Sequence, residues 1–276
     1  SCVYCQLGRT DHMTNQRQDF FELSDMIEEF EGFLKKNIDF DVVTIVGEGE
    51  PTLYLSLGKL IKEIKKRTDK PVAIITNGGL LYDDDVKKDL YEADICMPTL
   101  DAYDQASFKK INRPIGNMVY DDVYRGLVEF SKNYKNQLWL EMMFVKGMND
   151  DNTSISKLKE KLKAINYQRL YINTVVRPPA EEDVDKVSHK DLNSIAKSLG
   201  GLSIDVLMSE GFYSEIKDDF EAIKSIIKRH PMNHFEIKGF LDKRGHKDKS
   251  LVFKQLEDSS EIDILNNNGY KTYRLK

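Results

Sequence analysis

Short apolar runs alternate along most of the chain with longer segments in which apolar residues recur at helical spacing. The apolar runs predict buried strands, and they cover Val42–Val46, Val72–Ile75, Ile95–Leu100, Leu138–Val145, Arg169–Val175 and a final short run, Ile204–Leu207. The segments with helical spacing cover residues 23–36, 55–67, 83–92, 119–134, 152–164 and 188–198. Strands that alternate with helices favour a parallel sheet with crossover helices.

Polar residues and glycines follow several of these strands at the point where each strand ends. They are Gly47–Glu50, Thr76–Gly79, Asp101 and Arg177. An α/β barrel gathers its chemistry at the carboxyl ends of its strands, so the pattern predicts a partial (β/α) barrel of about six strands with these residues in one cleft.

The pattern changes near residue 218. Three short helical segments, Asp218–Arg229, Asn233–Leu241 and Asp248–Leu256, precede two strand-like runs, Glu261–Leu265 and Tyr270–Leu275, joined by a turn at Asn266–Gly269. Three helices followed by a two-stranded wing resemble a winged helix-turn-helix. We therefore expect a barrel domain over residues 1–214 and a small winged-helix-like domain over 215–276.

Composition and charge narrow the class of protein. The 276 residues are 40% hydrophobic and 32% charged, which is typical of a globular protein with a full core. No apolar run approaches the roughly 20 residues of a membrane span, and three cysteines favour a reducing, cytoplasmic location over a disulfide framework. The net charge is −5, but residues 220–276 contain 12 Lys and Arg against 8 Asp and Glu.

Two thiols lie three positions apart at the start of the chain, in Ser1-Cys2-Val3-Tyr4-Cys5. Thiols at this spacing can reach one metal ion or cluster, or each other. The remaining cysteine, Cys96, lies within a predicted strand and is expected to be a core residue.

Taken together, the cysteine pair and the strand-end motifs resemble the radical S-adenosylmethionine (radical SAM) superfamily. The family's signature is Cys-x3-Cys-x2-Cys, and Cys2 and Cys5 match its second and third cysteines. Gly47-Glu48-Gly49-Glu50-Pro51 is similar to the family's Gly-Gly-Glu-Pro motif. The resemblance implies that the first cysteine lies three residues upstream of Ser1, together with the first barrel strand, and that this 276-residue form has little activity.

Further segments are similar to one branch of the superfamily, the Fe–S oxidoreductases related to the synthase of the tricyclic wyosine base of tRNA. These segments are Cys2–Thr10, Gly49–Leu53, Thr76–Gly78, Leu100–Ala102, Ile111–Pro114 and Asn173–Glu181. Members of that branch often carry a winged-helix-like extension at the C-terminus.

The resemblance implies a role for each candidate site residue. Cys2 and Cys5 would ligate a [4Fe–4S] cluster, and Glu50 with the backbone of Gly47 and Gly49 would bind the amino group of S-adenosylmethionine. The remaining candidates would bind the same cofactor or the substrate: Asn77, Asp101 and Glu141 near the ribose, Asn173 and Arg177 near the cofactor carboxylate or the substrate, and Arg113 near an anionic substrate. An electron from the cluster would cleave the cofactor to a 5′-deoxyadenosyl radical, which abstracts hydrogen from a tRNA base, a peptide or a metabolite.

The resemblance also implies an electron donor such as flavodoxin or ferredoxin. Two alternatives remain open from the sequence. In the first, the barrel senses the cluster or the cofactor and the C-terminal domain binds nucleic acid through the basic residues Lys243, Arg244, Lys247, Lys249 and Lys254. In the second, Cys2 and Cys5 bind zinc.

Overall fold

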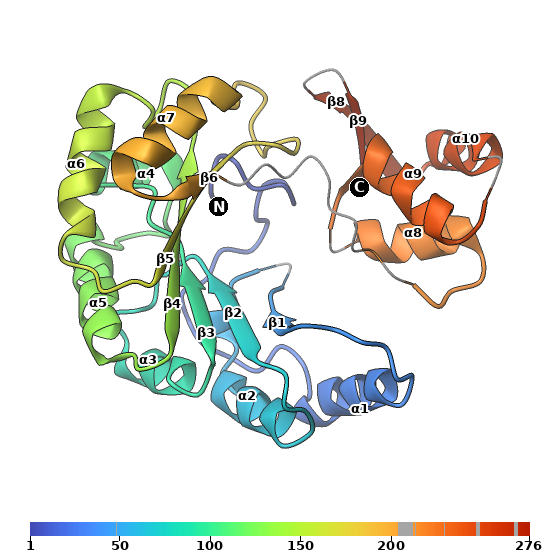
Figure 1. Cartoon of the computed structure of the whole chain (residues 1–276), viewed down its shortest axis with the longest axis horizontal. Coiled ribbons are helices and arrows are strands. Elements are labelled where there is room, and N and C mark those ends of the chain that lie inside the picture. The colour runs from blue at the N-terminus through green and yellow to red at the C-terminus, as the bar shows by residue number, and fades with distance from the viewer. Residues whose placement is uncertain (48, 204–211, 213, 229, 247–248, 268–269) are drawn as a thin grey trace.

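A computed structural model describes residues 1–47, 49–203, 212, 214–228, 230–246, 249–267 and 270–276. Its larger part is a six-stranded parallel sheet in the order β1-β2-β3-β4-β5-β6. The strands are β1 (Val43–Ile45), β2 (Val72–Thr76), β3 (Ile95–Pro98), β4 (Gln137–Phe144), β5 (Arg169–Thr174) and β6 (Leu202–Ser203). The order in space follows the order in sequence, and the sheet curves as part of a barrel (Figure 1).

One helix precedes the first strand and the others connect successive strands, and the helices cover the outer side of the curved sheet (Figure 1). They are α1 (Leu23–Leu34), α2 (Leu57–Lys65), α3 (Asp84–Leu90), α4 (Gln105–Ile111), α5 (Tyr120–Asn133), α6 (Asn152–Leu162) and α7 (His189–Leu199), with a 3-10 turn, η1 (Pro51–Leu53), after β1. The sequence pattern had not predicted η1 or α4. No helix in the described part of the chain is long and apolar enough to cross a membrane.

Side-chain oxygens fix where several of these helices begin. Asp83, Asp104, Asp151 and Ser188 each accept hydrogen bonds from backbone N–H groups in the first turn of the helix that follows. Such caps satisfy N–H groups that have no partner within the helix. They therefore fix the residue at which the loop before each helix ends and the helix begins.

Strand β4 shows how the sheet divides its side chains between two faces. Leu138, Leu140, Met142 and Phe144 are buried in the core beneath the helices. The alternate residues, Trp139, Glu141 and Met143, are partly exposed. Since successive side chains of a strand point to opposite faces, these three lie on the inner, concave face of the sheet.

The prediction of a buried strand at Val42–Val46 is wrong in one respect. β1 covers only Val43–Ile45, and Val46 is 60% exposed. Within the described residues β1 pairs with β2 alone, so it is an edge strand whose inner side chains have less to pack against. The last predicted strand, Ile204–Leu207, lies outside the described residues, and β6 is found just before it.

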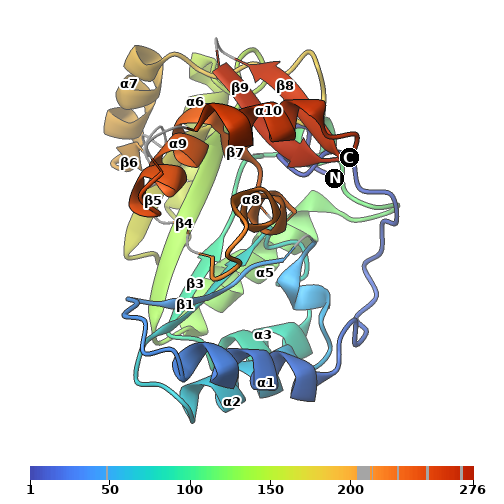
Figure 2. The same ribbon diagram turned by 90° about the vertical axis from the view of Figure 1, so that its right-hand side faces the viewer.

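The C-terminal residues form a second, smaller core. It comprises α8 (Asp219–Ile227), β7 (Met232–Asn233), α9 (His234–Lys243), α10 (Ser250–Asp258), β8 (Ile262–Asn267) and β9 (Tyr270–Leu275). The strands make an antiparallel sheet in the order β7-β9-β8. Its three helices and terminal hairpin were predicted, whereas β7 was not. Viewed from the side, these elements lie in front of the inner face of the large sheet (Figure 2).

Gly126 in α5 offers a test of how closely the outer helices pack on the strand-end loops. A Cβ at Gly126 would lie 2.4–2.6 Å from the backbone of Leu81 and Tyr82, which no side-chain movement can relieve. We expect Gly126→Ala to lower the free energy of unfolding by about 3 kcal/mol, measured by urea unfolding followed by circular dichroism.

Gly32→Ala in α1 is the matched control, because nothing lies within 4 Å of the Cβ it would gain. Alanine favours helices over glycine, so this variant should gain about 0.5–1 kcal/mol. Equal effects of the two substitutions would contradict the close approach of α5 to Leu81 and Tyr82.

Candidate functional site

The two N-terminal cysteines lie in one tightly turned loop, which we call the cysteine loop (residues 1–8). The N–H of Cys5 donates to the carbonyl of Cys2 (3.1 Å), and the N–H of Gly8 donates to the carbonyl of Cys5 (3.2 Å). Gly8 has a φ of +89°, which favours glycine. The turn between Cys2 and Cys5 places both thiols on the same short loop.

The cysteine loop is bound to the sheet through the buried carboxylate of Asp101, which follows β3. Asp101 is 2% exposed. Its Oδ2 accepts from the Tyr4 hydroxyl (2.5 Å) and from Nδ2 of Asn112 (2.8 Å), while its Oδ1 accepts from the N–H of Met143 (2.8 Å). Burial raises the pKa of Asp101 to about 6, although these three donors oppose the shift.

Cys2 itself lies close to this network. Nδ2 of Asn112 is 3.6 Å from its sulfur, and the backbone N–H of Val3 donates to the carbonyl of Ile111 (2.9 Å). Burial and then the charge of Asp101 raise the pKa of the Cys2 thiol, whereas the Asn112 hydrogen bond lowers it. A cation beside the sulfur would stabilise the thiolate against these effects.

Two arginines and a glutamate close the outer side of the cysteine loop. Arg113 has a φ of +44°, and its Nε donates to the carbonyl of Ser1 (2.8 Å). Glu181 accepts from Arg9 (2.7 and 2.9 Å) and from Arg113, and these bonds lower the pKa of its carboxyl to about 2. The Nη2 atom of Arg113 is buried and has no hydrogen-bond partner within the described residues.

Glu50, in the loop after β1, joins that loop and η1 to the end of β2. Its Oε1 accepts from the N–H (3.1 Å) and hydroxyl (2.7 Å) of Thr52 and from the hydroxyl of Thr76, and its Oε2 accepts from the N–H of Asn77 (2.7 Å). Oε1 is therefore saturated, and Oε2 keeps one lone pair for a further donor. An ammonium group could use this position.

The glycine and asparagine candidates surround Glu50. Apart from its chain neighbours, no described residue has an atom within 4 Å of a Cβ built on Gly49, so the backbone there leaves room for a ligand. Gly47 would meet only the backbone of Gly49, at 3.7 Å. Asn77 is exposed, and its Oδ1 accepts from the N–H of Gly79 (2.7 Å), which forms a turn after β2. Between Gly47 and Gly49, residue 48 lies outside the described residues.

Glu141 and Asn173 form a pair on the inner face. Nδ2 of Asn173 donates to Oε1 of Glu141 (3.2 Å). Burial raises the pKa of Glu141, and the Asn173 hydrogen bond lowers it in part. The pair links β4 with β5 and lies on the same face as Met143, whose backbone binds Asp101.

Arg177 binds the C-terminal elements. It donates to Oε1 of Glu236 in α9 (2.9 Å) and to Oε1 of Gln6 in the cysteine loop (2.8 Å), and it lies 3.4 Å from Nδ1 of His230. The side chains of Arg177 and Glu236 are 11% and 1% exposed. Arg177 therefore connects the cysteine loop to α9, and a contact with cofactor or substrate stays a prediction.

The structure brings most of the predicted residues to one end of the sheet. Glu50 binds the end of β2, the N–H of Thr99 donates to the carbonyl of Thr76 (3.1 Å), and Asp101 follows directly and binds the cysteine loop. Sequence reasoning missed Asn149, whose Nδ2 donates to the carbonyl of Asp101 (3.1 Å), and Glu236, whereas Thr76 was part of the predicted Thr76–Gly79 motif. Only Asn112 carried a signal, as part of the Ile-Asn-Arg-Pro segment.

The donor set fits a [4Fe–4S] cluster in part. Soft thiolates are the ligands such clusters use, and the orphaned Nη2 of Arg113 beside Ser1 is a donor that an anionic group could satisfy. Across the described residues no group of three or more Cys, His, Asp or Glu side chains is placed to hold a single metal ion. Cys2 and Cys5 therefore fit as two of the ligands.

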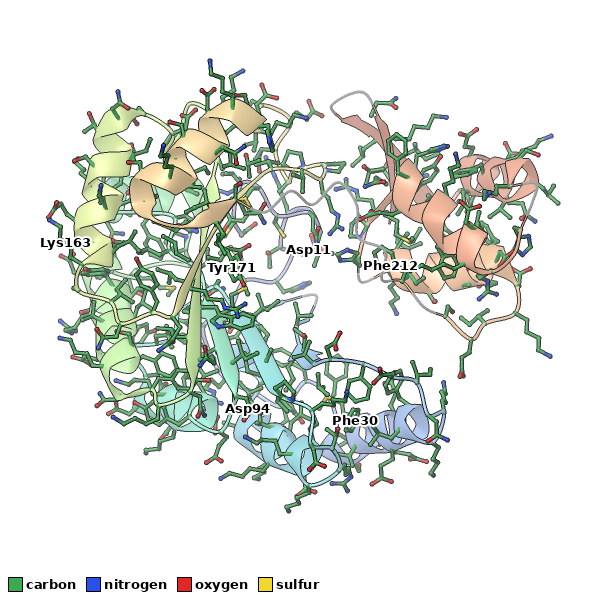
Figure 3. The ribbon with its side chains drawn as sticks, viewed as in Figure 1. Asp11, Phe30, Asp94, Lys163, Tyr171 and Phe212 are labelled. Carbon is green, nitrogen blue, oxygen red and sulfur yellow. The ribbon has the colours of Figure 1, made fainter. Side chains whose placement is uncertain are left out.

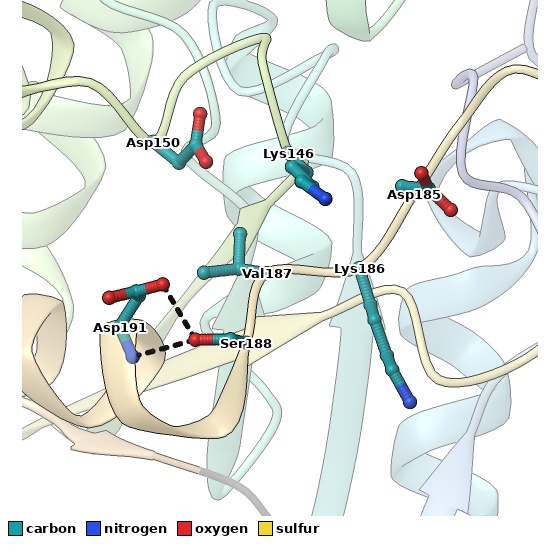
Figure 4. A pocket seen from close by; sticks show the side chains of 7 residues that line it. All are labelled: Lys146, Asp150, Asp185, Lys186, Val187, Ser188 and Asp191. Atoms are coloured by element: carbon teal, nitrogen blue, oxygen red, sulfur yellow. Dashed lines mark hydrogen bonds between the residues drawn. The ribbon is translucent and has the colours of Figure 1, made fainter. Parts of the chain in front are cut away.

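A separate pocket of about 340 Å³ lies beyond the end of β4 (Figure 4). Its lining is Lys146, Asp150, Asp185, Lys186, Val187, Ser188 and Asp191. Several of its polar groups already bind the protein: Asp150 accepts from the N–H of Gly147 (2.7 Å), and Ser188 pairs with Asp191 (2.6 Å). None of the predicted site residues lines this pocket.

A partial barrel with a cysteine loop at the carboxyl ends of its strands defines the class of protein. Residues 1–158 match the radical SAM superfamily, and the chain belongs to that family. Enzymes of this superfamily use a [4Fe–4S] cluster and S-adenosylmethionine, so these are the cofactors of this protein. The superfamily prediction is confirmed, while the narrower wyosine-related branch stays a prediction.

Two proteins of similar sequence differ in how much of their own length this chain spans. The chain is 35% identical over 253 residues to a UPF0026 protein of Methanocaldococcus jannaschii. The match covers 88% of this chain and 78% of the relative. It is 34% identical over 197 residues to a Brachyspira hyodysenteriae protein named GTPase Obg, but there it spans 29% of the relative's length.

Among solved structures, a radical SAM methyltransferase from Sphaerobacter thermophilus matches with a TM-score of 0.50 at 12% identity. The match covers 67% of this chain and 57% of that one. At this identity the likeness supports the fold alone.

The first prediction from the site concerns Glu50. Replacing it with alanine leaves the N–H groups of Thr52 and Asn77 without their acceptor. We expect Glu50→Ala to lower the free energy of unfolding by about 1–3 kcal/mol, measured by urea unfolding of the apo protein. The control is Glu92→Ala, which breaks a surface ion pair with Lys62 and should cost less than about 1 kcal/mol. Equal losses would show that Glu50 does not join the loop after β1 to the end of β2.

The second prediction concerns His230, which faces Arg177. Burial and then the Arg177 charge lower the pKa of His230 to about 4. The unfolded chain therefore binds a proton at higher pH than the folded chain, so stability falls as the pH drops from about 6.5 to 4. The pKa difference corresponds to about 3 kcal/mol, which partial exposure reduces to about 1–2 kcal/mol.

Urea unfolding at several pH values tests this expectation. His230→Gln should remove that part of the pH dependence, whereas the control His12→Gln, at an exposed position, should leave it in place. An unchanged pH profile in His230→Gln would mean that His230 is not buried against Arg177.

Proposed function

We propose that this chain carries the catalytic site of a radical SAM enzyme, with Cys2 and Cys5 as two ligands of its [4Fe–4S] cluster. The observation that supports the proposal best is the hydrogen bonding of Tyr4 and Cys2 in the cysteine loop to Asp101 and Asn112 at the carboxyl ends of the strands. When bound, the cluster and S-adenosylmethionine supply reductive cleavage of the sulfonium and hydrogen abstraction from the substrate.

Within this proposal the protein's own residues hold and orient the cofactor. Oε2 of Glu50 would accept a hydrogen bond from the methionine ammonium, and the backbone at Gly47 and Gly49 would let that group approach. The rest of the cofactor site would consist of Asn77, Asp101, Glu141 and Asn173. Asp101 acts mainly as a positioning residue, because its carboxylate accepts hydrogen bonds from Tyr4 of the cysteine loop, from Asn112 after α4 and from the backbone of β4.

The C-terminal elements fit a winged-helix-like domain over residues 215–276. The order α8, β7, α9, α10, β8, β9, with an antiparallel β7-β9-β8 sheet, supports this description. Its contacts with Arg177 support a role in covering the mouth of the barrel and excluding water from the reaction. The substrate is a tRNA base, a peptide or a metabolite, and an external donor such as flavodoxin or ferredoxin supplies the electron.

No observation favours the alternative of a nucleic-acid-binding regulator. Arg244 donates to Asp219 (2.6 Å) and to the carbonyls of Ser214, Ile216 and Lys217, so its guanidinium is committed within the protein. Lys249 pairs with Asp242 (2.6 Å). Lys247 lies outside the described residues.

The test is anaerobic reconstitution of the full-length protein with iron and sulfide, followed by dithionite, S-adenosylmethionine and an assay for 5′-deoxyadenosine. We expect product and a brown protein, both lost in Cys5→Ala. The matched control is Cys96→Ala, since Cys96 is buried in the core of the sheet and should leave the cluster intact. Zinc binding by a colourless protein without product would overturn the proposal.

A further inference from the structure

Four side chains gather on the inner face of the sheet, away from the cysteine loop and outside every role assigned above. They are Gln137 and Trp139 of β4 and Arg169 and Tyr171 of β5, and we call them the inner-face cluster. Trp139 is in register with Arg169, and Glu141 with Tyr171. Tyr171, labelled in Figure 3, lies on the side of the sheet opposite α6.

The members of the inner-face cluster hold one another in place. The Arg169 guanidinium lies 4.4 Å from the centre of the Trp139 ring, and its Nη1 donates to the Tyr171 hydroxyl (3.1 Å). The Trp139 and Tyr171 rings meet edge to face at 6.0 Å. The indole Nε1 donates to Oε1 of Gln137 (3.4 Å). The guanidinium is thus oriented before any ligand arrives.

The charge of Arg169 is not balanced nearby. Arg169 is exposed and forms no ion pair with any acidic side chain in the described ranges. Among the residues that the structure describes, only the Tyr171 hydroxyl accepts from one of its five N–H donors. A planar guanidinium with free donors binds a carboxylate or phosphate through two parallel hydrogen bonds.

The two aromatic rings are partly exposed on the same inner face. Rings and a guanidinium held in this way bind planar aromatic ligands by stacking. The amide nitrogen of Gln137 stays available to a polar edge, because its oxygen is the atom that binds Trp139. The cluster therefore offers one cation, two ring surfaces and one amide donor in one place.

The position of the inner-face cluster relates it to the proposed cofactor site. Glu141 and Asn173 come two residues after Trp139 and Tyr171 on the same strands, so they lie on the same face about 7 Å further along. A molecule bound at the cluster would extend along the inner face toward that pair.

We propose that the inner-face cluster binds a planar aromatic molecule that carries a carboxylate or phosphate, with Arg169 as the anchor of its negative charge. In so far as this molecule is the substrate, the inference rests on the proposed radical SAM function. Binding at the inner-face cluster needs neither the [4Fe–4S] cluster nor S-adenosylmethionine, so this inference and the proposed function can fail separately.

The test uses the single tryptophan of the chain, Trp139, as a reporter. Guanosine 5′-monophosphate and nicotinate, an aromatic phosphate and an aromatic carboxylate, are titrated into the protein while Trp139 fluorescence and calorimetric heat are followed. At least one should bind and quench the fluorescence, and which one does so distinguishes the two kinds of anion. Guanosine, without the phosphate, and ribose 5-phosphate, without the ring, should each bind about tenfold more weakly than the nucleotide if the phosphate is preferred.

Arg169→Ala should weaken binding about tenfold or more by calorimetry. Arg125→Ala is the matched control, because Arg125 is an exposed arginine on the outer helix α5 and should leave binding unchanged. Tyr171→Phe, which removes only the hydroxyl that orients Arg169, should weaken binding by a smaller factor and serves if Arg169→Ala does not fold by circular dichroism.

Two results would overturn the inference: neither probe binds at millimolar concentration, or both the Arg169 and Tyr171 variants keep the wild-type affinity. Formation of 5′-deoxyadenosine without binding of the probes would leave the proposed function in place and remove this inference. Binding of a probe that requires Arg169, with no formation of 5′-deoxyadenosine, would leave this inference in place and remove the proposed function.

Discussion

The site depends on the hydrogen bonds that the buried carboxylate of Asp101 accepts. It joins Tyr4 and Asn112 to the backbone of β4, so one side chain links the cysteine loop, the segment after α4 and the sheet. Burying a charge is costly unless hydrogen bonds compensate it, and three donors do so here. Without this carboxylate, the loop that carries Cys2 and Cys5 would lose its main polar attachment to the strand ends.

The carboxylates at the strand ends differ in whether they can bind a ligand in addition to their contacts within the protein. Glu50 accepts two hydrogen bonds from Thr52 in η1 and two from the end of β2, and it keeps one acceptor position, so the same group can stabilise the fold and bind a ligand. Asp101 has contacts only within the protein among the residues described. Glu141 is intermediate between these cases, since Asn173 donates to one of its oxygens and its side chain is partly exposed.

The C-terminal elements connect to the site through a buried ion pair. Glu236 of α9 caps its own helix by accepting from the N–H of Asn233 (2.7 Å) and also binds Arg177. Because Arg177 binds Gln6 as well, the position of α9 and the position of the cysteine loop are linked. A buried pair of this kind is costly to break on one side only, which ties the smaller core to the barrel.

Local pattern was enough to predict the parallel sheet, most of its helices, the terminal hairpin and the two short motifs at Cys2–Cys5 and Gly47–Glu50, because periodicity and turn residues act over a few positions. The exposed edge of β1, the Asp101–Tyr4–Asn112 network and the binding of Arg177 by Glu236 could not be predicted this way. Asp101 and Tyr4 are 97 positions apart, and Arg177 and Glu236 are 59 apart. Contacts over such separations depend on how the strands and helices pack, so only the tertiary structure decided them.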